Sequence, residues 1–106
     1  MLFRSYIDDI VDAVLRVLEM PGAVGQAFNI GNPRSVCTTY DLALRVLRAS
    51  GSDSKIIFQP ITYSDVEIRI PDITKAREIL RWEPHVDLDD GLERTIDWYR
   101  EQSRQT

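Results

Sequence analysis

Hydrophobic residues recur at spacings of three and four near the start of the chain, the spacing that places side chains on one face of a helix. We expect this first helix over about Asp8 to Met20, with Asp8 or Asp9 capping its amino end, where free backbone N–H groups favour a carboxylate. Pro21 and the glycine after it end the pattern. Six residues form the apolar stripe: Ile7, Ile10, Val11, Val14, Val17 and Leu18.

The same periodicity predicts three more helices, over about residues 39–49, 73–80 and 88–101. Each follows a residue that can cap a helix: Thr38, Asp72 and Asp87. Thr38 and Asp41 also have the spacing of a capping box, and Gly51 ends the second helix.

Two short apolar runs between the helices are typical of strands. Ala27–Ile30 leads into a Gly-Asn-Pro turn, and Lys55–Gln59 is closed by Pro60. Residues 61–71 have no dominant period and are expected to form an ordered loop or an edge strand. The sequence therefore predicts one α/β to α+β unit of about four helices with two or three short strands.

Composition narrows the functional class. The chain has 106 residues, 43% of them hydrophobic and 28% charged, which fits one globular domain. The net charge of −4 argues against a nucleic-acid partner, and short apolar runs argue against a membrane-spanning segment. Without a signal-peptide pattern at the start, we expect a cytoplasmic location. A single cysteine, Cys37, and a single histidine, His85, exclude an internal disulfide and make a Cys/His zinc site implausible.

The residues alone do not assemble a catalytic or cofactor site. The five glycines, at 22, 25, 31, 51 and 91, lack the close spacing of a dinucleotide fingerprint, and no phosphate-binding Gly-Lys-Ser/Thr loop is present. The acidic run at 87–90 fails as a calcium loop because Leu92 stands where glycine is required. Cys37 is interpreted as a packing residue and His85 as a solvated loop residue. No metal or cofactor ligand is therefore expected in this chain.

One segment, from Tyr63 to Asp72, combines groups that bind nucleotides. Arg69 offers a planar fork of donors suited to phosphate or carboxylate oxygens, and Tyr63 offers a flat ring and a hydroxyl. The alternative is that Arg69 pairs with a neighbouring carboxylate of the same segment. Arg4 is a second candidate phosphate contact. Three carboxylates could pair with Arg69: Asp65, Glu67 and Asp72.

Five segments in register give the chain a resemblance to the extended short-chain dehydrogenase/reductases, the NAD-dependent nucleotide-sugar epimerases, dehydratases and decarboxylases. The segments are Arg4–Ala13, Phe28–Pro33, Asp65–Ala76, Trp82–Pro84 and Gly91–Tyr99. Within the family, the chain is most similar to UDP-glucuronic acid decarboxylases. Their Tyr-x-Asp-Val-x-x-Arg-x-Pro pattern is matched by Tyr63, Asp65, Val66, Arg69 and Pro71.

The resemblance implies roles for individual residues. Tyr63 would contact the nucleotide. Arg69 would face the diphosphate and sugar and act as a proton donor in the decarboxylase. The family usually places its substrate-site arginine four residues before the tyrosine of Tyr-Ile-Asp-Asp, whereas Arg4 stands two residues before Tyr6. Arg81 stands where the family commonly has glycine before tryptophan, which implies a different helix exit.

The resemblance also implies that residues 1–106 are a single C-terminal, substrate-binding fragment whose nucleotide-binding half is missing. NAD would bind the parent enzyme and not this fragment, the substrate would be a UDP-sugar or a dTDP-sugar, and the fragment alone would be inactive. The first helix and the Phe28–Ile30 strand would normally pack on the missing half, so their apolar surface would be exposed and could pair as a homodimer. The alternative is a small helical interaction or assembly domain without a ligand site.

Overall fold

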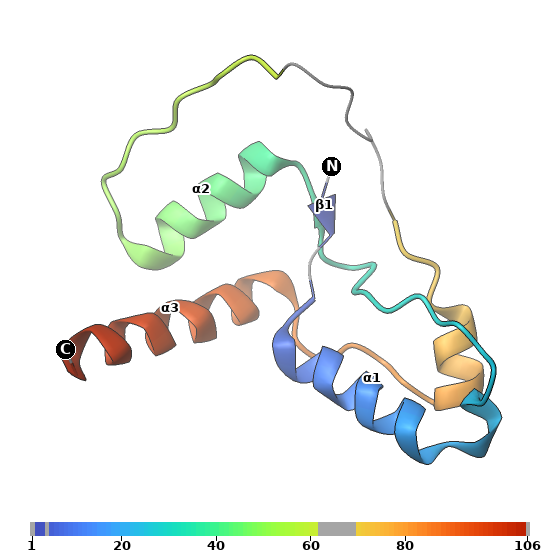
Figure 1. Cartoon of the computed structure of the whole chain (residues 1–106). Helices are drawn as coiled ribbons and strands as arrows, with labels where there is room; N and C mark the ends of the chain where they lie inside the picture. Colours follow the sequence, from blue (N-terminus) through green and yellow to red (C-terminus); the bar gives the residue numbers. More distant parts are fainter. Residues whose placement is uncertain (1, 4, 62–69, 106) are drawn as a thin grey trace.

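A computed structural model of the chain describes residues 2–3, 5–61 and 70–105. Over these residues the chain runs through helices and very short strands, without a central sheet (Figure 1). In order, the elements are β1 (Leu2–Phe3), α1 (Ile7–Glu19), the 3₁₀ turn η1 (Pro21–Ala23), β2 (Val36–Cys37), α2 (Thr39–Ser50), the π-helical turn η2 (Ala76–Leu80) and α3 (Leu88–Gln105). Residues 74 and 75 are helical and lead into η2.

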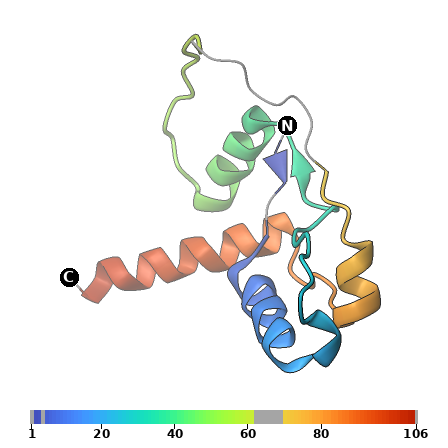
Figure 2. The same ribbon diagram turned by 45° about the vertical axis from the view of Figure 1, so that its right-hand side comes forward.

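These elements form two groups (Figures 1 and 2). The helices α2 and α3 pack against each other, whereas α1 and η1 pack against η2. The pairing of β1 with β2 lies between the groups, and the whole molecule measures 49 × 40 × 21 Å. Among the described residues, none of the helices combines the length and apolar character needed to cross a bilayer.

The predicted helix positions are confirmed within a few residues, and so are three of their boundaries. The Thr38 hydroxyl accepts a hydrogen bond from the Asp41 N–H at 3.0 Å and caps α2. Gly51 ends α2 with a φ of 67°, a left-handed conformation that glycine adopts without strain. Asp72 accepts a hydrogen bond from the Thr74 N–H at 3.0 Å at the start of the next helical segment.

The predicted strands are wrong. Ala27–Ile30 and Lys55–Gln59 belong to no strand, and β1 and β2 instead form a two-residue antiparallel pair, with Leu2 opposite Cys37 and Phe3 opposite Val36. A strand exists only where a second strand completes its hydrogen-bond ladder, and these two segments meet none among the described residues. The fold is mostly helical, as the α+β alternative allows, and it contains no Rossmann sheet within the described part of the chain.

The apolar core surrounds η2. Ile73, Ala76, Leu80 and Trp82 are almost fully buried, and Ala13 of α1 and Ala23 of η1 pack against them. The Trp82 indole Nε1–H donates to the backbone oxygen of Asp9 at 2.9 Å, which satisfies its one polar atom inside the core.

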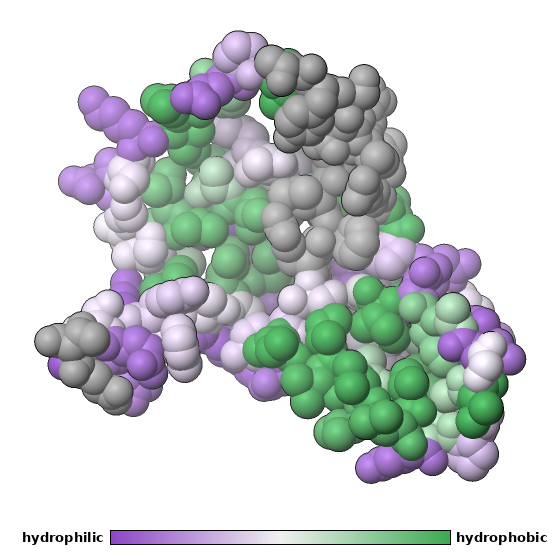
Figure 3. Space-filling view, in the orientation of Figure 1, coloured by the Kyte–Doolittle hydropathy of each residue, from purple (hydrophilic) through white to green (hydrophobic). Residues whose placement is uncertain are grey.

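α1 is oriented with its apolar stripe toward solvent. Its buried residues are Asp9 and Ala13. The stripe forms the hydrophobic patch over α1 in the space-filling view (Figure 3). Six large aliphatic side chains of α1 are exposed: Ile7, Val11, Val14, Leu15, Val17 and Leu18.

The predicted carboxylate cap of α1 is wrong, whereas Asp87 does lie directly before α3, where its backbone oxygen accepts the Gly91 N–H at 2.9 Å. Tyr6 occupies the N-cap position of α1 and makes no capping side-chain bond. The carboxylates of Asp9 and Asp87 are instead bonded to distant segments of the chain, as described below.

Candidate functional site

The predicted substrate residues Tyr63, Arg69 and Arg4 lie outside the described residues, so they remain predictions. The structure describes what flanks their segment. Ile61 and Ile70 lie on either side of residues 62–69, and both side chains are exposed.

The carboxy-terminal flank of the segment is firmly attached to the core. One Asp72 oxygen accepts hydrogen bonds from both the backbone N–H and the hydroxyl of Thr74, at 3.0 and 2.6 Å. These bonds hold the pKa of the Asp72 carboxyl below its usual range. The next residue, Ile73, is buried beside Trp82.

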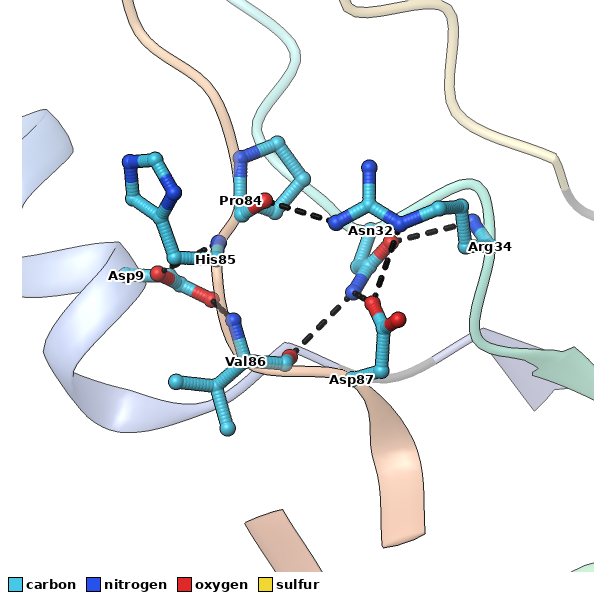
Figure 4. A network of polar contacts seen from close by, with 7 residues as sticks. All are labelled: Asp9, Asn32, Arg34, Pro84, His85, Val86 and Asp87. Carbon is cyan, nitrogen blue, oxygen red and sulfur yellow. Dashed lines mark hydrogen bonds and ion pairs between the residues drawn. The ribbon is translucent and has the colours of Figure 1, made fainter. Parts of the chain in front are cut away.

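A polar cluster joins the turn after Ile30 to the connection between η2 and α3 (Figure 4). The two Asp9 carboxylate oxygens accept the backbone N–H groups of His85 and Val86, both at 3.0 Å. Asn32, completely buried, donates its side-chain amide to the Val86 carbonyl at 3.2 Å and to the Asp87 carboxylate at 2.9 Å. These bonds pin α1 and the turn to the residues that lead into α3.

Arg34 completes this cluster on the solvent side. Its guanidinium donates to the Asp87 carboxylate at 3.0 Å and to the Pro84 carbonyl at 2.7 Å. The bond from Asn32 and, secondarily, the contact with Arg34 lower the pKa of Asp87. Asp87 thus acts as a bridge between segments, where the sequence predicted only a helix cap. Its partners lie more than fifty positions away, so no local signal reveals them.

Two other sequence interpretations agree with the structure: Cys37 is buried in β2 and the His85 side chain is exposed. Arg45 of α2, whose side chain is partly buried, donates hydrogen bonds to the Asp41 and Asp89 carboxylates at 2.9 Å each, and these carboxylates raise its pKa. Among the described residues, no group of three or more His, Cys, Asp or Glu side chains is arranged to hold a metal ion.

A hollow of about 240 Å³ lies where the start of α1 meets α2 and α3. Its wall is mainly apolar. Gly91 is one of its lining residues, and a Cβ added there would come within 3.3 Å of the Tyr6 ring. Among the described residues that line the hollow, none is basic. Its residues include Tyr6, Leu42, Val46, Val86, Leu92 and Thr95.

Comparison with known proteins gives consistent relatives, although no family model matches the chain. UDP-glucuronic acid decarboxylase 4 of Arabidopsis thaliana is 38% identical over 92% of this chain and 21% of its own length. UDP-glucose 4-epimerase of Mycolicibacterium smegmatis is 33% identical over 93% of this chain and 31% of its own length.

A solved structure agrees with these relatives. The crystal structure of a Thermotoga maritima UDP-glucose 4-epimerase with UDP-glucose matches 95% of this chain with a TM-score of 0.85 and 35% identity. This chain is a homologue of the UDP-sugar decarboxylases and epimerases, which are extended short-chain dehydrogenase/reductases.

The similarity has a defined extent. The chain corresponds to the C-terminal region of these enzymes and spans about a fifth to a third of their length. The suspected resemblance is therefore confirmed, and the interaction or assembly domain is not favoured.

Proposed function

We propose that this chain is the C-terminal, substrate-binding portion of an NAD-dependent nucleotide-sugar enzyme of the UDP-glucuronate decarboxylase type. The observation that carries the proposal is the match over 95% of the chain to part of an epimerase whose crystal structure contains UDP-glucose. The similarity to a UDP-glucuronic acid decarboxylase over 92% of the chain favours that reaction type. The preferred ligand is a UDP-sugar, with a dTDP-sugar as the alternative.

Binding is assigned to the segment that Asp72 anchors. The Arg69 guanidinium holds diphosphate oxygens through two parallel N–H donors, and the Tyr63 ring packs on the nucleotide. In the decarboxylase the Arg69 side chain is also the candidate proton donor, and Arg4 is a candidate second contact to phosphate. The Asp72–Thr74 bonds support this assignment because they fix the backbone three residues beyond Arg69.

NAD supplies hydride chemistry when it is bound to the parent enzyme. The residues of this chain do not fit the cofactor, because the glycines are too far apart to form a pyrophosphate-binding turn. We therefore assign no step through NAD to this chain, and we expect the isolated chain to be catalytically inactive.

Titration of the purified chain with UDP, followed by calorimetry or NMR shifts, tests the proposal. Saturable binding should weaken at least tenfold in Arg69→Ala, because the diphosphate loses its bidentate partner. Arg48→Ala, which removes an exposed arginine from the last turn of α2, is the matched control and should bind normally. If UDP does not bind at millimolar concentration, or if both variants bind equally, the proposed site is wrong.

A further inference from the structure

No further inference is drawn: the strongest candidate, the outward apolar face of α1 with the hollow of about 300 Å³ beside it, belongs to a chain that spans about a fifth to a third of its relatives' length, and nothing in the structure shows what covers it.

Discussion

α1 packs against η2, yet the two regions are held in the fold by different kinds of interaction. Around η2, Leu80 and Trp82 bury their whole side chains in an apolar cluster. α1 contributes little more than Ala13 to that cluster and directs its large aliphatic residues outward. Its attachment is mainly polar and runs through Asp9 and through Arg16, whose guanidinium donates to the Leu80 and Arg81 carbonyls at 3.1 and 2.9 Å.

This difference separates two uses of hydrophobic residues. Around η2 they stabilise the chain itself. On α1 they contribute little until something covers them, so hydrogen bonds must keep the helix in position with that face outward. Identical substitutions in the two regions should therefore have very different consequences for stability.

The largest contrast is expected between two leucines. Leu80→Ala should lower the free energy of unfolding by about 2–5 kcal/mol, because it leaves a cavity in the core. Leu18→Ala should change it by no more than about 0.5 kcal/mol, because Leu18 is exposed. Urea denaturation followed by circular dichroism, at concentrations where the chain is monomeric, measures both values. If both variants lost the same free energy of unfolding, Leu18 would be more buried than the structure shows.

The polar attachment of α1 should account for the next largest effect. Asp9→Asn replaces one acceptor oxygen with an NH₂ group that faces a backbone N–H, and we expect a loss of about 1–3 kcal/mol. Faster hydrogen exchange at the His85 and Val86 amides should accompany it. Asp8→Asn removes the same charge from an exposed position and should be nearly neutral. If Asp9→Asn were as stable as Asp8→Asn, the conclusion that the Asp9 hydrogen bonds hold α1 in place would be wrong.

The same contrast explains what the sequence could reveal. Helical periodicity and caps such as Thr38 depend on residues three or four apart, so the helices could be predicted locally. Periodicity also identified which residues share a face of α1, but the direction of that face depends on packing. The Ala27–Ile30 and Lys55–Gln59 strands failed because a ladder requires a second strand, whose presence no local run of residues reports.

The residues of the candidate site also differ in how far the sequence could reveal them. Arg69 and Tyr63 could be singled out from residue chemistry and a family pattern, since both are written in one short segment. The contacts that hold the surrounding segments in place could not be identified from the sequence. Asp9 meets His85 across 76 positions and Asn32 meets Asp87 across 55, distances at which sequence spacing carries no information.

The smallest effect is expected where the two regions join. Arg81 ends η2 with a φ of 53°, in the left-handed region that costs a non-glycine residue about 1–2 kcal/mol, and its carbonyl accepts one of the Arg16 bonds. Arg81 thus takes a conformation that glycine adopts without strain and that its own side chain disfavours. Arg81→Gly keeps the carbonyl and removes the strain, while a more flexible unfolded chain offsets part of the gain. We expect a net stabilisation of up to about 1 kcal/mol in urea denaturation, whereas Arg48→Gly within α2 should lose about 1 kcal/mol. A loss in Arg81→Gly would mean that the arginine side chain itself supports the junction between α1 and η2.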